Sequence, residues 1–189
     1  PAGAPSRSTL KLDEAFQCLL SAAERDAWLA PGRTAVDLGA APGGWSWQLA
    51  RRGLTVTAVD NGPMDEALLA SAPVSHVRAD GFRYRPPGAV DWVVCDIVEQ
   101  PHRIARLMGD WLVRGDASAA AFNLKLPMKR RYQAVDRALA GLREQLGRER
   151  VLTVKHLYHD REEVTVVTVP APAGRRPKPP GPGSPGGDR

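Results

Sequence analysis

The stretch GAAPGGWSW (39–47) packs three glycines, one proline and two tryptophans into nine positions. The apolar run TAVDL (34–38) comes directly before it, and QLARRG (48–53), which reads as the start of a helix, comes directly after it. A strand, a glycine-rich turn and a helix in this order make the usual nucleotide-binding turn of an α/β protein. The stretch therefore predicts a nucleotide pocket at the end of a buried strand.

The kind of nucleotide follows from what the turn lacks. A dinucleotide fingerprint, G-x-G-x-x-G, needs a glycine where this chain has Ala41. A phosphate-binding P-loop would place Gly39, Gly44 and Ser46 in register, but its lysine is replaced by Trp45. The turn therefore predicts a ligand that approaches the backbone closely and carries no polyphosphate. S-adenosylmethionine, an adenosine joined to a methionine, is such a ligand.

Three aspartates follow successive predicted strands and favour the same ligand. Asp60 stands 21 residues after Gly39 at the end of the second strand, a distance that suits a contact to ribose hydroxyls. Asp80 ends the third strand, level with the adenine, and Asp96 ends the fourth. Each aspartate alone could be a helix cap or a solvated loop residue. Ligands of open α/β sheets bind outside the carboxyl ends of the strands, so the three together favour a cofactor site.

Apolar strand candidates alternate with helical stretches, which is the pattern of a parallel, doubly wound α/β sheet. The end of the chain differs, because VLTVKHLY (151–158) and EEVTVVTV (162–169) are too close for a helix between them. We therefore expect a Rossmann-like α/β fold with a mostly parallel seven-stranded sheet and an antiparallel C-terminal hairpin. The other strand candidates are residues 34–38, 55–59, 74–79, 90–95 and 118–126. The clearest helical segments between the strands are residues 104–112 and 129–147.

Two helical segments show an apolar stripe at three- and four-residue steps. The first covers residues 8–29, with Ser8 or Thr9 as its cap, and the second covers residues 129–147. The residues expected on the buried stripes are Leu12, Phe16, Leu19 and Ala23 in the first helix, and Tyr132, Val135, Leu139, Leu142 and Leu146 in the second.

Composition bounds the class of protein. A chain of 189 residues with 43% hydrophobic residues is long enough for one domain with a core. No apolar run approaches the ~18 residues of a membrane span, and no signal peptide is visible. Cys18 and Cys95 lie far apart without ligand-like spacing. We therefore expect a cytoplasmic protein without a metal site, and we expect a monomer.

Residues 170–189 differ in composition from the rest of the chain, with seven prolines and five glycines. Such a segment cannot build a core, so we expect a disordered tail after a folded domain of residues 1–169. Four basic residues against one acid give the tail +3 of the formal net charge of +5. The remaining net charge of +2 on residues 1–169 does not by itself indicate nucleic-acid binding. Because the chain starts with Pro1, we expect it to be part of a longer protein.

Seven motifs together resemble those of one family: SRSTLKLDEA, VDLGAAPGGW, VDNGPM, DGFRYRP, VCDIVE, FNLKLPMKRR and LYHDREEVTV. From Ser6 to Val169 the chain is similar to the RlmM-type members of the FtsJ superfamily, bacterial methyltransferases of ribose 2′-hydroxyls in 23S ribosomal RNA. The resemblance implies a class I methyltransferase fold, S-adenosylmethionine as cofactor, and 23S ribosomal RNA as partner with a cytidine as target. The N-terminal THUMP-like RNA-binding domain of the family is expected to be absent from this chain.

The resemblance also implies the residues of the site. The catalytic Lys-Asp-Lys-Glu pattern falls on Lys11, Asp96, Lys125 and Glu163, with Glu162 as a neighbour easily confused with the last. No metal takes part. The implied cofactor contacts are Ser8, Ala41, Pro42, Gly43, Gly44, Asp60, Asp80 and Asp96.

The chemistry of ribose methylation explains this set of charges. A hydroxyl is a poor nucleophile, so a base must take its proton as the new bond forms. Lys11 disfavours the ammonium form of Lys125, whereas Asp96 and Glu163 favour it and orient both lysines. A lysine on a central strand is costly unless it is paired, which favours a functional Lys125. Lys11 could instead be a solvated helix residue, and Glu163 a charged residue of a sheet edge.

Lys129, Arg130 and Arg131 give the local argument for RNA. They are expected in the first turn of a helix, where positive charge opposes the helix dipole. Phosphates of RNA would compensate this cluster. A solvated charged face is the alternative interpretation.

Rival functions remain open at this point. A methyltransferase for base nitrogens would carry an Asn/Asp-Pro-Pro-aromatic stretch where this chain has DIVE (96–99). An enzyme for base carbons would need a nucleophilic cysteine, but Cys95 lies in an apolar strand. A catalytically silent cofactor-binding module for RNA or ribosome assembly would keep the glycine turn without needing Lys125. A methyltransferase for another RNA is a further alternative.

Overall fold

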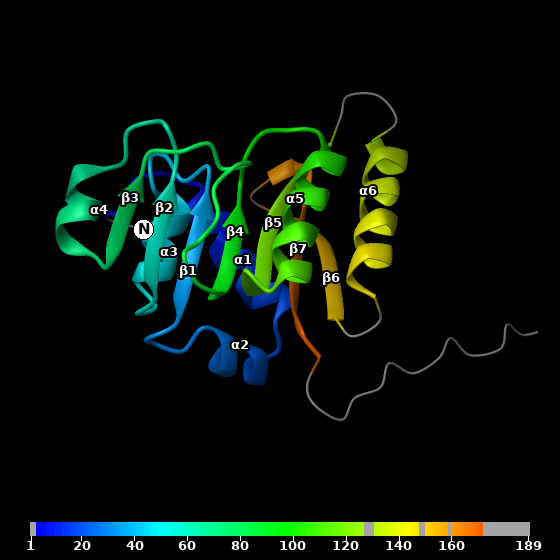
Figure 1. Cartoon of the computed structure of the whole chain (residues 1–189), viewed down its shortest axis with the longest axis horizontal. Helices are drawn as coiled ribbons and strands as arrows, with labels where there is room; N and C mark the ends of the chain where they lie inside the picture. Colours follow the sequence, from blue (N-terminus) through cyan, green and yellow to red (C-terminus); the bar gives the residue numbers. More distant parts are fainter. Residues whose placement is uncertain (1–2, 127–130, 148–149, 159, 172–189) are drawn as a thin grey trace, which may run out of the picture.

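The computed structural model describes residues 3–126, 131–147, 150–158 and 160–171. Figure 1 shows the path of the chain through its helices and strands. In chain order these are α1 (Thr9–Leu19), α2 (Ala22–Trp28), β1 (Thr34–Leu38), α3 (Gly44–Ala50), β2 (Thr55–Val59), α4 (Glu66–Ser71), β3 (Val74–Val77), β4 (Val90–Cys95), α5 (Pro101–Arg114), β5 (Ala117–Lys125), α6 (Arg131–Leu146), β6 (Arg150–Leu157) and β7 (Asp160–Pro170).

The seven strands of the described residues form one sheet in the order β3-β2-β1-β4-β5-β7-β6. The strands from β1 to β5 pair in parallel, whereas β7 pairs antiparallel with both β5 and β6. The predicted mostly parallel seven-stranded sheet with an antiparallel C-terminal hairpin is therefore confirmed. Because β7 inserts between β5 and β6, the last strand of the described residues is an interior strand.

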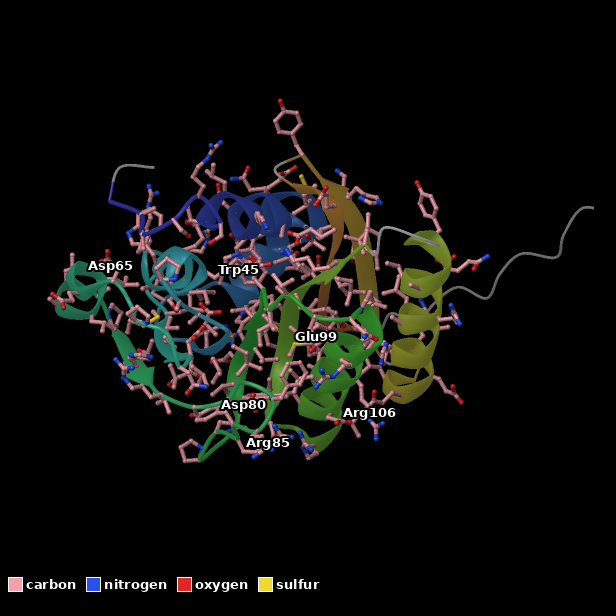
Figure 2. All side chains as sticks on the ribbon, turned by 90° about the horizontal axis from the view of Figure 1, so that it is seen from above. Trp45, Asp65, Asp80, Arg85, Glu99 and Arg106 are labelled. Carbon is pink, nitrogen blue, oxygen red and sulfur yellow. The ribbon has the colours of Figure 1, made fainter. Side chains whose placement is uncertain are left out.

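Helices cover both faces of this sheet, as parallel strands joined by helical crossovers require. Seen from above in Figure 2, α1 and α3 lie on one side of the strands and α5 and α6 on the other. The short helix α4 lies beside β3 at one end of the sheet (Figure 1). The central strands are therefore buried on both faces.

The strands alternate between two core layers, because successive side chains of a strand point to opposite faces. On β4, Trp92 and Val94 belong to the layer under α1 and α3, while Val93 and Cys95 belong to the layer under α5 and α6. The same alternation decides which polar residues at the strand ends can meet. Polar residues that alternate in step with Trp92 on β4, with Ala121 on β5 or with Val167 on β7 therefore face α1.

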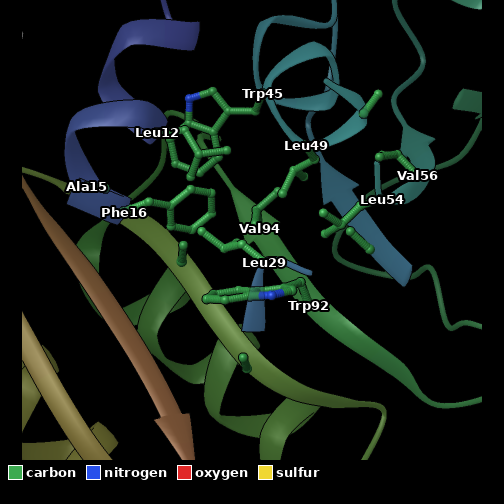
Figure 3. Close-up of a cluster of buried hydrophobic side chains, with 14 of the residues drawn as sticks. Leu12, Ala15, Phe16, Leu29, Trp45, Leu49, Leu54, Val56, Trp92 and Val94 are labelled. Carbon is green, nitrogen blue, oxygen red and sulfur yellow. The ribbon is translucent and has the colours of Figure 1, made fainter. Parts of the chain in front are cut away.

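The core on the α1 side explains why the N-terminal helix docks there. Leu12 and Phe16 are fully buried, and the Phe16 ring meets Trp92 edge-on with the ring centres 5.3 Å apart. The close-up in Figure 3 shows these side chains together with Trp45 of α3. The Trp92 indole also donates a hydrogen bond to the Trp28 carbonyl at 2.7 Å. This packing fixes α1 and α2 against the sheet.

The single helix predicted over residues 8–29 is wrong, because the chain restarts the helix at a new cap. The Ser21 side chain accepts a hydrogen bond from the Glu24 amide, and the Glu24 carboxylate accepts one from the Ser21 amide. This capping box begins α2, and it leaves Ala23 exposed rather than on the buried stripe. Ser8 occupies the N-cap of α1 without a side-chain capping bond.

Other boundaries also differ from the prediction. α3 begins at Gly44, so Trp45 belongs to the helix rather than to the turn. β3 ends at Val77, two residues earlier than predicted. Tyr132 is 76% exposed and not part of the buried stripe of α6, since the packed part of that helix starts only at Val135.

Several predictions concern residues that the structure does not describe. Lys129 and Arg130 lie outside the described residues, as do residues 172–189 of the predicted tail. Arg131 opens α6, but its side chain is also outside the description. In the part of the chain that is described, no helix has the length and apolar character needed to cross a membrane.

Replacing Phe16 by alanine tests the core that holds α1. The ring is fully buried, so Phe16→Ala should lower the free energy of unfolding by about 3–5 kcal/mol through lost burial and the cavity left behind. Val98→Ala, at a side chain that is 79% exposed, should change it by less than about 0.5 kcal/mol. Urea unfolding followed by circular dichroism measures both variants. Equal midpoints would show that this contact does not anchor α1.

Candidate active site

Two hollows of about 220 Å³ each open at the carboxyl edge of the sheet and meet at Gly39. The first lies beside the N-terminal segment and is lined by residues that include Ser8 and Asp96. The second is lined by residues that include Asp60 and Asp80. Together they form what we call the turn groove. It runs along the edge at which open α/β sheets bind their ligands.

Glycine is required at two places in the turn. Gly39 has a φ of 74°, and a Cβ there would lie 2.3 Å from Cγ1 of Ile97. A Cβ at Gly44 would lie 2.3 Å from the hydroxyl oxygens of both Ser6 and Ser8. The backbone of the turn can therefore approach the loop after β4 on one side and the N-terminal segment on the other.

Trp45 replaces the P-loop lysine with a structural anchor. Its ring is buried, and its Nε1 donates a hydrogen bond to the Ser8 carbonyl at 3.0 Å. The hydroxyl oxygens of Ser6 and Ser8 are 2.7 Å apart. The segment before α1 is thereby held over the turn and lines the first hollow. Sequence reasoning missed this contact, and its only signal was a tryptophan in place of a lysine.

Asp60 ties the end of β2 to the glycine turn. Its Oδ2 accepts a hydrogen bond from the Ala41 amide at 3.0 Å, and its Oδ1 accepts one from the Gly62 amide at 2.7 Å. Asp80 accepts a hydrogen bond from the Phe82 amide at 2.9 Å and is half exposed. A carboxylate has about four acceptor sites, so Asp60 keeps the capacity to bind ligand hydroxyls.

Most of the predicted cofactor residues line the turn groove. Gly43 and Gly44 instead lie where α3 begins, where a Cβ on Gly43 would lie 2.5 Å from Leu68. Their role is to let the turn pack closely. The first hollow is lined by the predicted residues Ser8, Ala41, Pro42 and Asp96. The second hollow is lined by the predicted residues Asp60 and Asp80.

The four predicted catalytic residues meet on the α1 face of the sheet. Lys125 on β5 and Glu163 on β7 are direct partners across the antiparallel pair. Asp96 directly follows β4 and shares the parity of Trp92, so it lies on the same face. Lys11 reaches both carboxylates from α1. We call these four residues the charged cluster.

Glu163 is the centre of the charged cluster. Its Oε1 lies 2.9 Å from Lys11 Nζ, and its Oε2 contacts Lys125 Nζ. The Asp96 oxygens lie 3.7 Å from Lys11 Nζ and 3.6 Å from Lys125 Nζ. Two ammonium groups and two carboxylates sum to zero formal charge. Glu163 is 1% exposed, whereas the other three side chains are 17–24% exposed and can meet a substrate.

Glu163, and not its neighbour Glu162, belongs to the charged cluster. Glu163 is buried, whereas Glu162 is exposed and its backbone carbonyl accepts a hydrogen bond from the Leu126 amide at 2.7 Å. β7 lies between β5 and β6, so Glu163 is not a residue of the sheet edge. The alternative that Glu163 is a charged residue of a sheet edge is therefore wrong, and its burial favours Glu163 over Glu162 for the predicted catalytic role.

Burial raises the pKa of the Glu163 carboxyl, and the nearby charge of Asp96 adds to the rise. Hydrogen bonds from Lys125 and Lys11 act in the opposite direction, because they favour the carboxylate. The negative charge of Glu163 is therefore tolerated only because donors surround it.

Asn123 and Thr165 are buried polar residues that sequence reasoning missed. Asn123 Nδ2 donates to Asp96 Oδ1 at 2.8 Å and to Glu163 Oε1 at 2.7 Å. Thr165 Oγ1 donates to Asn123 Oδ1 at 2.7 Å. A signal was present in the sequence, since Asn123 interrupts an apolar strand two residues before Lys125 and must point to the same face.

Asp37 is a buried carboxylate that sequence reasoning missed. It is fully buried, lines the first hollow and accepts a hydrogen bond from Ser46 Oγ at 2.8 Å. Burial raises the pKa of Asp37 to about 7, although the hydrogen bond from Ser46 lowers it. Its signal was an acidic residue inside the apolar run before the glycine turn.

Comparison with protein families places this arrangement among known enzymes. The model of FtsJ-like methyltransferases matches residues 4–167. The chain belongs to the FtsJ-like methyltransferase family. The matched region contains both the turn groove and the charged cluster of this FtsJ-like domain.

Curated relatives of the FtsJ-like domain carry a common name. The ribosomal RNA large subunit methyltransferase M of Laribacter hongkongensis is 57% identical over 180 residues, which cover 93% of this chain and 51% of the relative. Other relatives of that name are 54–59% identical. The chain spans about half the length of the curated relatives it matches.

Solved structures share the fold of the FtsJ-like domain at low sequence identity. A candidate hemolysin of Lactococcus lactis matches with a TM-score of 0.66 and 15% identity, over 89% of both chains. Magnesium protoporphyrin IX methyltransferase of Synechocystis PCC 6803, with bound S-adenosylmethionine, matches with a TM-score of 0.58 and 18% identity. That match covers 86% of this chain and 79% of the other. These likenesses show the fold alone.

Asp37→Asn tests the buried carboxyl through the pH dependence of stability. The pKa of Asp37 is about 7 in the folded chain and 3.8 ordinarily, so between these values the folded chain holds a proton that the unfolded chain releases. The resulting stabilisation is fully present below about pH 4 and is lost, at about 1.4 kcal/mol per pH unit or less, as pH rises to 7. Asparagine does not titrate. The stability of Asp37→Asn relative to the parent should therefore rise from pH 5 to 7 and level off by pH 8.

Urea unfolding of the parent and of Asp37→Asn at these pH values measures the difference. Ser46→Ala provides a control, because it removes the hydrogen bond that lowers the pKa of Asp37 and should leave the carboxyl protonated to higher pH. A parent–variant difference that stays constant from pH 5 to 8 would show that Asp37 is ionised throughout.

Proposed function

We propose that this FtsJ-like domain, residues 1–169, transfers a methyl group from S-adenosylmethionine to a ribose 2′-hydroxyl of 23S ribosomal RNA. The observation that carries the proposal is that Asp96 belongs both to the turn groove and to the charged cluster. A site for the methyl donor therefore adjoins a site for proton transfer. The names of the curated relatives support ribosomal RNA as the substrate. A cytidine as the target follows the family resemblance.

The residues of the turn groove fit S-adenosylmethionine. The groove is elongated, because its two hollows join at Gly39, where a Cβ would collide with Ile97. Among the described residues that line it there is no lysine or arginine, which suits a ligand without phosphates. Asp60 would hold the ribose hydroxyls, Asp80 would lie towards the adenine, and Ser8 with the turn backbone would hold the methionine part. When bound, the cofactor supplies an electrophilic methyl group on its sulfonium.

The charged cluster supplies the proton acceptor. Lys125 takes the proton of the ribose hydroxyl as the oxygen becomes methylated. It can do so only as a neutral amine. Lys11 keeps its charge and stabilises the negative charge that develops on the oxygen. Glu163 and Asp96 orient the two lysines.

The residues around Cys95 disfavour methylation of a base carbon. The Cys95 thiol is fully buried, and burial raises its pKa to about 12. A thiol in that state is not a nucleophile near neutral pH. The loop after β4 also reads Asp-Ile-Val-Glu (96–99), without the Pro-Pro-aromatic stretch of enzymes that methylate base nitrogens.

RNA binding is proposed for the segment that links β5 to α6. The segment carries Lys129 and Arg130, and Arg131 follows as the first residue of α6, so the three stand four to six residues after Lys125. A residue four positions away along the chain is at most about 14 Å distant, so phosphates bound there would lie near the charged cluster. The basic segment would thus help to bring the ribose of a bound strand to Lys125.

Two properties of the working protein complete the proposal. The free thiols of Cys18 and Cys95 suit a reducing compartment, so we propose the cytoplasm. All four members of the charged cluster come from one chain, so a monomer suffices for the reaction.

Mass spectrometry of nucleosides tests the proposed function. The chain is incubated with methyl-labelled S-adenosylmethionine and an unmodified 23S ribosomal RNA transcript, and the RNA is then digested. We expect label in one 2′-O-methylated nucleoside and none in methylated bases. Label in a base would refute the acceptor, and label only in another RNA would change the substrate. Cofactor binding by calorimetry without any transfer would support a silent assembly module instead.

Lys125→Ala tests the proton acceptor. The single-turnover rate of methyl transfer should fall about 10²–10⁴-fold, the usual cost of losing a general base. Cofactor affinity measured by calorimetry should change little, because Lys125 does not line the turn groove. Lys125→Arg should not restore the rate, since a guanidinium stays protonated. Arg114→Ala, at an exposed basic residue that ends α5, is the control with an unchanged rate. A near-parental rate in Lys125→Arg would place the base elsewhere.

A further inference from the structure

Asn123 touches both carboxylates of the charged cluster at once. It is fully buried, so water does not replace its contacts. Its Nδ2 donates one hydrogen to Asp96 at 2.8 Å and the other to Glu163 at 2.7 Å. An amide nitrogen carries two hydrogens, so both are used on the two acids.

Thr165 holds the other end of this amide. Asn123 and Thr165 are direct partners across the β5–β7 pair, as Lys125 and Glu163 are two residues further along. The Thr165 hydroxyl donates to Asn123 Oδ1 at 2.7 Å, so the carbonyl end is bound as well. With both ends bound, the amide cannot rotate away from the carboxylates. The Asn123–Thr165 pair therefore supports the Lys125–Glu163 pair, which lies on the same face of the sheet.

The two carboxylates need this donor, because each disfavours the charge of the other. Burial and the neighbouring Asp96 both favour a protonated Glu163. If Glu163 took up a proton, Lys11 and Lys125 would lose the carboxylate that contacts both of them. They would keep only Asp96, at 3.6–3.7 Å. A hydrogen bond donated to each ionised acid opposes that protonation.

We propose that Asn123, held by Thr165, is a positioning residue of methyl transfer whose amide, bound to both Asp96 and Glu163, keeps Glu163 ionised. This inference rests on the proposed methyl transfer by the charged cluster. It makes Asn123 and Thr165 the residues that set the pH at which Glu163 is protonated and both lysines lose their orientation. Protonation of the base Lys125 also slows the reaction, so protonation of Glu163 is seen as a second, steeper fall of the rate at lower pH, which we call the acid limb.

Substitutions at Asn123 and Thr165 leave every charged group of the site in place. Glu163 therefore keeps the same charged surroundings in each variant, so a changed pH profile reports on the amide and the hydroxyl. The charged groups on the elements packed around Glu163 are Lys11 and Glu14 of α1, Asp96 after β4, Lys125 of β5 and Lys155 of β6.

The matched variants Thr165→Val and Thr168→Val test the proposal. Each removes a buried hydroxyl from β7, but Thr168 lies on the opposite face, and its hydroxyl has no hydrogen-bond partner among the described residues. Thr165→Val should move the acid limb of the single-turnover rate–pH profile upward by a few tenths of a unit to about one unit, because the carboxylate form is less well supported. Thr168→Val should leave the limb in place, and Thr165→Ser, which keeps the hydroxyl, should restore it.

Asn123→Leu removes the amide itself and should shift the acid limb further, by about one unit or more. A uniform loss of rate with an unmoved acid limb in Thr165→Val and Asn123→Leu would show a purely structural role and overturn the proposal. If Asn123→Leu does not fold, the comparison of Thr165→Val with Thr165→Ser and Thr168→Val decides alone.

Carbon-13 NMR of the chain labelled at the glutamate side-chain carboxyls gives a readout that needs no methyl transfer. The Glu163 resonance, assigned by its loss in Glu163→Gln, should titrate at higher pH in Thr165→Val than in the parent. Identical titration in the two would refute the role of Asn123. If the parent methylates no RNA, the proposed function fails, while this titration still decides whether Asn123 keeps Glu163 ionised.

Discussion

A carboxylate buried among apolar strands is stable only where positive charge and hydrogen-bond donors surround it. Glu163 meets this condition through Lys11 from α1, Lys125 from β5 and the amide of Asn123. The pairing depends in turn on the core, because α1 brings Lys11 to the sheet only while Phe16 is packed against the strands. The docked helix then excludes water from Glu163. Charge pairing and apolar packing therefore hold each other in place.

The sheet and its ligand edge could be predicted from local patterns in the sequence. The spacing of apolar residues in strands and the alternation of strands with helices depend on residues close in sequence, so they can be recognised without knowledge of the fold. Parallel topology then brings Asp60, Asp80 and Asp96 to one edge, since the carboxyl ends of parallel strands meet there. Lys11 and Glu163 lie near opposite ends of the domain, and no spacing rule joins them. Only the resemblance to known motifs predicted that pair.

The missed features depend on contacts between elements. Asn123 and Thr165 are visible as polar residues in apolar strands, but their partnership requires the β5–β7 register, which tertiary pairing sets. The same register separates Glu163 from Glu162. The indole of Trp45 became an anchor because the N-terminal segment crosses the turn, a path that no local pattern encodes.

Because β7 inserts between β5 and β6, the charged cluster is completed only late in the synthesis of the chain. A ribosome makes Lys11, Asp96 and Lys125 before Glu163, because synthesis runs from the N-terminus. Until the final strand enters its gap, the two lysines lack their shared carboxylate, and β5 lacks its antiparallel neighbour. The entry of β7 therefore completes both the hydrogen bonding of β5 and the charge balance of the cluster. A nascent chain contains every residue of the turn groove before it contains β7, whereas the charged cluster is complete only when β7 is in place.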